Sequence, residues 1–210
     1  MARGQGPPSA SSGEGVCLIR CSRLAVVCAS IAAAALIQRA PALIQSGKNA
    51  TAVGPYVFSA PSGFSVVSLP PGMKTPPGFL RPVILRGKHR PDGTAAVLTV
   101  LVGDIPARER TWTLSRHMTN VMAGTRNSLL RQGFSNWKES KPQSVKIGPI
   151  KFLRVEFTVT GPGGRRRVHG VNYSGRDQNR GIIGSGSDAI PADRQSLPQM
   201  EAAIRSLRRK

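Results

Sequence analysis

The sequence predicts an α+β domain: a mostly antiparallel β-sheet with one long central helix and a C-terminal helix packed on it. Three observations predict this class. Residues 152–160, FLRVEFTVT, alternate apolar and polar side chains, as half-buried strands do. Residues 113–133 and 196–210 place apolar side chains three and four positions apart, as amphipathic helices do. The 23 glycines and 17 prolines supply the turns that antiparallel strands need.

Before this domain we expect a disordered N-terminus followed by an export segment. Residues 1–23 are basic, and their first part is rich in Gly, Pro and Ser, which is typical of disorder. The apolar run Leu24–Ile37 is shorter than the roughly 20 residues that span a bilayer, and with Arg20 and Arg23 before it matches a secretory signal. Residues 24–42 are therefore predicted to be a signal peptide or a signal anchor, the alternative being a buried helix of the domain itself. Export would place the protein in the periplasm or at the membrane.

The chain is strongly basic, with 30 Lys and Arg against 10 Asp and Glu and a formal net charge of +20. Such an excess attracts polyanions, namely nucleic acid, anionic lipid or an acidic polymer, unless it reflects a general bias of the source proteome. Aromatic residues make up only 5% of the chain, which disfavours stacking on bases. All the cysteines, Cys17, Cys21 and Cys28, precede the domain, which is therefore expected to contain no disulfide and no thiolate metal site.

Residues 43–55 are expected to form a linker, and the folded domain is expected to span residues 56–210. At its start, residues 56–69 carry spaced apolar side chains between Pro and Gly, which predicts two short strands around a turn. Residues 75–93 predict one irregular strand followed by a turn. The apolar run of residues 95–104 predicts a central strand.

The clearest helix covers residues 113–133. Glycine readily adopts the left-handed conformation found at helix C-termini, so Gly133 is expected to end this helix. Its expected buried stripe consists of Leu114, Met118, Val121, Met122, Thr125 and Leu129. Residues 136–147 then predict an exposed strand.

Arg165, Arg166 and Arg167 follow the turn residues 161–164, GPGG. A phosphate cradle would need glycine amides at the start of a helix, but residues 168–175 have the pattern of a strand. The arginines are therefore expected at the mouth of a β-hairpin, as a contact for an anionic partner.

The end of the chain predicts one more strand and the second helix. The strand is expected at residues 181–186. Ser196 and Gln199 have the spacing of a capping box, which predicts that the helix begins at Ser196. Its apolar stripe is expected to consist of Met200, Ala203, Ile204 and Leu207.

No constellation of residues predicts catalysis, a cofactor or a metal site. Residues 184–189, GSGSDA, have the spacing of a dinucleotide-binding loop, but no helix follows them directly. The histidines, His89, His117 and His169, show no metal-ligand spacing, and the acidic residues are scattered. We therefore predict a protein that is not an enzyme and has no evident small-molecule substrate. Chemistry performed by scattered polar residues is the alternative that stays open.

Several stretches resemble the PsbP-like superfamily, which includes PsbP and the DcrB-type domains of bacterial envelopes. They are YVFSAPSGFSV, AAVLTVLV, VEFTVTG followed by RVHGVNY, and LPQMEAAIRSLR, which together cover residues 56–208. The resemblance implies a binding or assembly module of the PsbP-like fold and carries over no functional residue. We therefore expect a non-catalytic binding or assembly protein of the cell envelope with a protein partner. The alternative is a basic protein that binds a polyanion.

Overall fold

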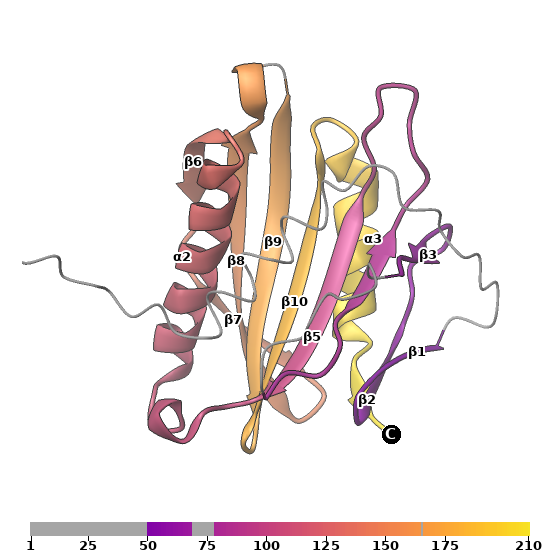
Figure 1. Ribbon diagram of the computed structural model, residues 1–210. Coiled ribbons are helices and arrows are strands. Elements are labelled where there is room, and N and C mark those ends of the chain that lie inside the picture. The colour runs from indigo at the N-terminus through magenta and orange to yellow at the C-terminus, as the bar shows by residue number, and fades with distance from the viewer. Residues whose placement is uncertain (1–49, 69–77, 165) are drawn as a thin grey trace, which may run out of the picture.

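The computed structural model describes residues 50–68, 78–164 and 166–210 (Figure 1). The region expected to be disordered, the predicted export segment and Arg165 lie outside the described residues. The described part contains an eight-stranded sheet in the order β3-β4-β5-β10-β9-β8-β6, with β7 also paired to β8. Every neighbouring pair of strands is antiparallel. This confirms the predicted α+β class.

The strands of the large sheet are β3 (Ser65–Val66), β4 (Val83–Arg86), β5 (Val97–Asp104), β6 (Ser135–Glu139), β7 (Gln143–Ile147), β8 (Ile150–Thr160), β9 (Arg167–Asp177) and β10 (Arg180–Ala189). A second, three-stranded sheet has the order β1-β2-β11, with β1 (Ala50–Val53), β2 (Tyr56–Ser59) and β11 (Arg208–Arg209). Two short 3-10 turns are η1 (Ala107–Glu109) and η2 (Pro162–Gly164).

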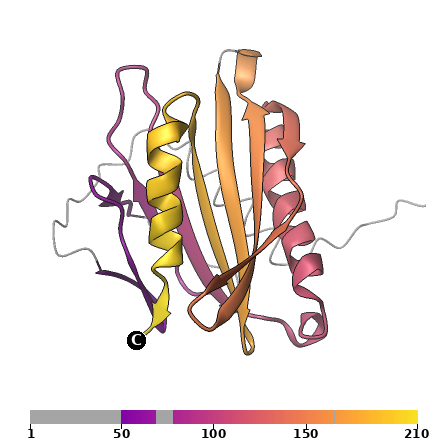
Figure 2. The same cartoon turned by 180° about the vertical axis from the view of Figure 1, so that it is seen from behind.

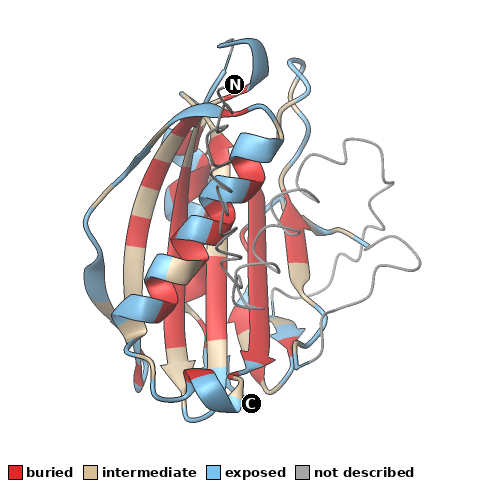
Figure 3. Ribbon diagram, turned by 60° about the vertical axis from the view of Figure 1, so that its left-hand side comes forward, coloured by how far each residue is buried: buried red, intermediate tan, exposed pale blue. Residues whose placement is uncertain are grey.

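The two long helices cover opposite faces of the large sheet (Figures 1 and 2). Helix α2 (Leu114–Arg131) packs against β9, β8 and β6. Its predicted stripe faces the sheet, because Met118, Val121, Met122, Thr125 and Leu129 are all buried; Leu114, at the first position of the helix, is only partly buried (Figure 3). Gly133 follows the helix end with φ +82, as predicted.

Helix α3 (Asp193–Arg205) packs against β10, β9 and β2 on the other face. It begins three residues earlier than predicted, and Ser196 is not its cap. The Ser196 hydroxyl instead donates to the carboxylate of Asp188, at 2.5 Å, so this side chain ties the helix to the sheet. The predicted stripe of Met200, Ala203, Ile204 and Leu207 is buried.

Two further predictions differ from the structure. Ala50–Val53, within the expected linker, is strand β1, because its backbone pairs with β2 across the tight turn at Gly54. Residues 136–147 are not a single strand: they contribute to β6 and β7, which both pair with β8. Pro142 precedes β7. Proline has no backbone N–H to donate to a neighbouring strand, so it suits an interruption between strands.

Arg209, near the end of the chain, and Tyr56, near the start of the domain, both bond to Asp177 at the end of β9. Asp177 accepts two hydrogen bonds from Arg209, at 2.7 and 2.8 Å, and one from the buried Tyr56 hydroxyl, at 2.5 Å. Burial alone would raise the pKa of Asp177, but these hydrogen bonds outweigh it and hold the pKa below its usual value. The carboxylate therefore stabilises the folded state only while it is ionised.

These hydrogen bonds of Asp177 make the free energy of unfolding depend on pH in the acid range. Since the folded pKa of Asp177 is lowered, its contribution is present above the ordinary value of about 3.9 and is lost as pH falls through the folded pKa. We expect Asp177→Asn to lower the urea midpoint at neutral pH, and the difference from wild type to shrink below about pH 4. If the difference in urea midpoint between the variant and wild type stayed constant as the pH fell below this value, the proposed role of ionised Asp177 would be contradicted.

Candidate functional site

Helix α2 covers only part of its face of the sheet. A pocket of about 510 Å³ lies beside the helix, on the face of the sheet formed by β10, β5 and β4. Its walls are α2 on one side and the loop between β4 and β5 on the other, and the tip of the β8–β9 hairpin borders it as well. Pockets of this size hold small-molecule ligands in other proteins.

The floor of the pocket carries a row of polar side chains. Thr99 of β5 pairs directly with Ser185 of β10, and Ser185 pairs directly with Asn172 of β9. Residues in direct register project to the same face of a sheet, so these three side chains form a line across neighbouring strands. Ser187 lies two residues further along β10 and also lines the pocket.

Apolar side chains surround this row. They are Val97, Leu101, Leu129, Phe134, Phe157, Val168 and Ile183. Phe157 is held in place because its ring stacks on Trp137, with ring centres 4.7 Å apart. The pocket is therefore mainly apolar, with a few polar groups at defined positions, as ligand sites usually are.

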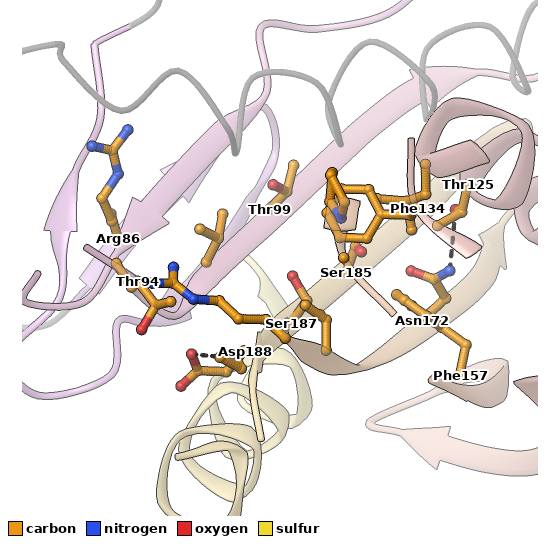
Figure 4. A pocket seen from close by; sticks show the side chains of 18 of the residues that line it. Arg86, Thr94, Thr99, Thr125, Phe134, Phe157, Asn172, Ser185, Ser187 and Asp188 are labelled. Carbon is orange, nitrogen blue, oxygen red and sulfur yellow. Dashed lines mark hydrogen bonds between the residues drawn. The ribbon is translucent and has the colours of Figure 1, made fainter. Parts of the chain in front are cut away.

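Asn172 closes one end of the pocket (Figure 4). Its side-chain amide donates to the Thr125 hydroxyl, at 3.2 Å, and to the sulfur of Met122, at 3.3 Å. The residue is fully buried, yet its carbonyl oxygen Oδ1 has no hydrogen-bond partner. A buried acceptor without a partner is uncommon in folded proteins and calls for an explanation.

Cationic side chains lie at the other end of the pocket and at its mouth. Arg86, at the end of β4, is far from Asn172 across the site and approaches His89 at 3.2 Å (Figure 4). Arg166 projects from the β8–β9 hairpin tip and donates to the backbone oxygen of Asp92 in the β4–β5 loop. This hydrogen bond joins the two hairpin tips that flank the pocket.

The β4–β5 loop is anchored by an ion pair whose carboxylate is completely buried. The side chain of Asp188, which is 0% exposed, accepts two hydrogen bonds from Arg90, one of them at 2.8 Å. It also accepts hydrogen bonds from the Ser196 hydroxyl and from the Ala189 amide. Asp188 therefore links the loop, β10 and α3 at the edge of the pocket, and its charge is fully engaged by these partners.

The predicted hairpin is confirmed, and it places two of the three arginines. The chain reverses between β8 and β9 through η2. Arg166 and Arg167 are both exposed; Arg166 also lines the pocket, and Arg167 lies at the start of β9. Contact of these arginines with an anionic partner stays a prediction.

The dinucleotide-loop spacing of residues 184–189 lies within strand β10. Gly184 and Gly186 face α3, where a Cβ atom would come within 3.0 to 3.2 Å of Ile204 and Met200. These glycines therefore allow close packing of the helix on the sheet. Ser185 and Ser187 alternate with these glycines and therefore point the opposite way, into the pocket. This alternation of serine and glycine is the signal in the sequence that could have indicated a polar pocket lining.

The histidines lie apart from one another. His89 is at the pocket rim, and His117 is buried on α2, where burial lowers its pKa. His169 lies on β9 and contacts Asp193 at 2.8 Å and Glu156 at 3.4 Å. Among the described residues, no group of three or more His, Cys, Asp or Glu side chains is placed to hold a metal ion.

No family model matches the sequence, and no curated protein matches it either. A solved structure that it resembles is cyanobacterial PsbP (CyanoP) from Synechocystis sp. PCC 6803. The TM-score is 0.55 at 16% identity, over 81% of this chain and 98% of that one. The chain therefore has the PsbP-like fold that the sequence predicted.

Weaker likenesses include two other proteins. LpqN of Mycobacterium tuberculosis, involved in cell envelope biogenesis, gives a TM-score of 0.44 at 11% identity, over 71% of this chain and 79% of that one. The Ran-binding protein Mog1p of Saccharomyces cerevisiae gives 0.43 at 11% identity, over 77% of this chain and 96% of that one. Within the described ranges, no helix is long and apolar enough to cross a bilayer.

Proposed function

We propose that the protein is an exported, non-catalytic binding protein of the cell envelope, and that the pocket beside α2 is its binding site. The observation that carries this proposal is the polar row of Thr99, Ser185 and Asn172 on the floor of an otherwise apolar pocket. Buried positions of a sheet are mostly apolar, yet Thr99 and Asn172 are both buried. Side chains that can form hydrogen bonds, set at fixed positions, suit recognition of a ligand.

We propose binding, and not catalysis, for these residues. A serine nucleophile needs a base within hydrogen-bond reach, and the base needs an orienting group. In the described part of the chain, no histidine or carboxylate side chain forms a hydrogen bond with Ser185 or Ser187. The acid nearest to them in the pocket, Asp188, is engaged by Arg90 and Ser196. Binding is therefore the simpler role for this pocket.

Export is supported by the sequence. The apolar run Leu24–Ile37 after two arginines is typical of a secretory signal. A tagged full-length chain produced in a Gram-negative host should be recovered from the periplasm or the membrane. Recovery in the cytosol, with the N-terminus intact, would contradict export.

The binding function is tested by filling the pocket. Ser185→Trp places an indole on the pocket floor, while Ser144→Trp adds the same group at an exposed position of β7 as a matched control. Native mass spectrometry and solvent extraction of the purified proteins should recover a bound molecule from wild type and the control, but not from Ser185→Trp. Equal recovery from all three, or none from wild type, would refute the pocket as the binding site.

A protein partner is part of the same proposal. The partner would be sought by affinity capture from envelope extracts of the source organism, at low and at moderate salt. Capture of no specific protein in either condition would count against it.

Polyanion binding is the second candidate function. A polar groove at the opposite end of the sheet is lined by Arg110, Arg180, Arg209 and Lys210 and contains one acid, Asp104. Each phosphate contact releases counterions, so binding of anionic vesicles through this groove should weaken steeply with salt. Vesicle binding that did not change with salt would exclude this candidate.

A further inference from the structure

We infer that the ligand of the pocket is an uncharged, mainly apolar molecule that carries a hydroxyl group at the end next to Asn172. The ligand hydroxyl would donate its proton to Oδ1 of Asn172 and accept one from the Ser185 hydroxyl. The rest of the ligand would lie on the apolar side chains of the pocket. This inference rests on the proposed binding function and specifies the class of its ligand.

The orientation of the Asn172 amide is determined by its neighbours. Its NH₂ nitrogen lies 3.2 Å from the Thr125 hydroxyl and 3.3 Å from the sulfur of Met122. The Thr125 hydroxyl gives its own proton to the Val121 carbonyl, at 2.9 Å, and a thioether sulfur has no proton to give. A reversed amide would turn Oδ1 towards two groups that cannot donate to it. The NH₂ group therefore faces Thr125 and Met122.

This orientation leaves the side-chain oxygen of Asn172 without a donor. Asn172 is 0% exposed, and Oδ1 has no hydrogen-bond partner among the described residues. Figure 4 shows this oxygen on the side of Ser185 and the nitrogen on the side of Thr125. A buried acceptor without a donor destabilises the folded protein, and a ligand that supplies the donor removes this cost.

Ser185 offers a second contact to the same ligand group. It pairs directly with Asn172 across β10 and β9, and side chains in direct register have their Cβ atoms roughly 4.5–5.5 Å apart. A hydroxyl group has one proton to donate and lone pairs that accept. One ligand hydroxyl between these two side chains can therefore donate to the amide oxygen and accept from the serine.

Other polar groups fit this end of the pocket less well. An ionised carboxylate only accepts hydrogen bonds, so it would set a second acceptor against Oδ1. An amide N–H can donate to Oδ1 but cannot accept from Ser185. An ammonium group would be buried without a counterion, because Asp188, the one acid among the described lining residues, is paired with Arg90. A hydroxyl is therefore the group that matches both side chains.

The body of the ligand is inferred to be apolar because the adjoining part of the pocket is apolar. Leu101 and Ile183 pair directly across β5 and β10, and Ile183 lies two residues before Ser185 on β10. Phe157 and Val168 line the pocket as well. Burial of apolar ligand surface against these side chains favours binding. A sugar, which has hydroxyl groups but little apolar surface, would leave these contacts unused.

Four small probes test the inference on the full-length protein by isothermal titration calorimetry. We expect octan-1-ol to bind most tightly. Its isomer heptyl methyl ether keeps the oxygen but lacks the proton, so it should bind about tenfold more weakly. Octan-1-amine, which is protonated at neutral pH, and octanoate carry the two opposite charges and should each bind at least as weakly as the ether.

Variants assign the preference for the alcohol to its residue. Asn172→Leu should abolish the preference for octan-1-ol over heptyl methyl ether while both still bind, which also shows that the variant is folded. Asn127→Leu makes the same exchange at an exposed position of α2 outside the pocket and should keep the preference. Ser185→Ala should weaken both probes and keep the preference, since both oxygens can accept from the serine.

The inference is overturned if the ether or either charged probe binds as tightly as octan-1-ol, or if no probe binds. It is also overturned if Asn172→Leu keeps the preference for the alcohol. The comparison of the four probes on wild type needs no variant, so it decides the question even if Asn172→Leu does not fold.

These outcomes are separate from those of the proposed function. Extraction of a charged or hydroxyl-free molecule from wild type, but not from Ser185→Trp, would preserve the binding function and overturn the inferred ligand class. An empty wild-type protein that also bound none of the probes would overturn both.

Discussion

Replacing Asp188 with alanine should destabilise the protein by about 1–3 kcal/mol, the usual cost of leaving buried hydrogen-bond donors without a partner. The carboxylate is completely buried and accepts hydrogen bonds from Arg90, Ser196 and the Ala189 amide. Without it, the partly buried guanidinium of Arg90 and the Ser196 hydroxyl lose their partner together. The change is measured as a shift of the urea midpoint at constant m-value.

Asp104→Ala is the matched control. Asp104 also pairs with an arginine, but its side chain is 72% exposed and lies 3.8 Å from Arg180. Exposed pairs of this kind contribute about 0–1 kcal/mol, so the control should unfold close to wild type. Similar losses for both variants would show that the buried position of Asp188 confers no special stability.

Because Arg90 holds the β4–β5 loop, Asp188→Ala should also weaken ligand binding.

Phe157→Ala should cost about 3–5 kcal/mol, the range found for removal of a buried phenylalanine. The ring stacks on Trp137 on one side and covers Gly170 on the neighbouring strand. A Cβ at Gly170 would lie 2.3 Å from the ring, so Gly170→Ala should itself cost about 1–3 kcal/mol through overpacking. Urea unfolding of the single and double variants measures both effects.

The double variant tests whether the cost of Gly170→Ala comes from its contact with the Phe157 ring. Once the ring is gone, the Cβ at position 170 has space, so Gly170→Ala should cost much less in the Phe157→Ala background. Gly181→Ala, in β10, serves as the control because its nearest neighbour would be at an ordinary 3.6 Å. Additive losses in the double variant would show that the ring and the glycine do not act as a pair.

The sequence predicted the elements that depend on local pattern. The alternation of residues 152–160 predicted β8, and Val155, Phe157 and Val159 are buried as expected. The other side of this strand, expected to be solvated, is instead partly covered by α3, since Arg154 is 13% exposed and bonds to Glu201. Which helix covers a strand depends on tertiary packing, and residue alternation does not contain that information.

The pocket could not be predicted for the same physical reason. Its polar row exists because the register of three strands that are distant in sequence brings Thr99, Ser185 and Asn172 into line. The strand patterns indicate neither the register nor the part of the sheet that α2 leaves uncovered. The spacing of GSGSDA matches a dinucleotide-binding loop, although serines that alternate with glycine on a central strand also fit the polar lining of a pocket.

Strands β1 and β11 flank β2 in the small sheet, so the first and last strands of the described domain lie beside the same segment. A force applied at Ala50, where this part of the described chain begins, would act on β1, which pairs with β2 and with no strand of the large sheet among the described residues. We expect the hydrogen bonds between β1 and β2 to break under this force before those between the strands beneath the pocket. Such a force could thus separate the small sheet while the strands that line the pocket kept their pairing.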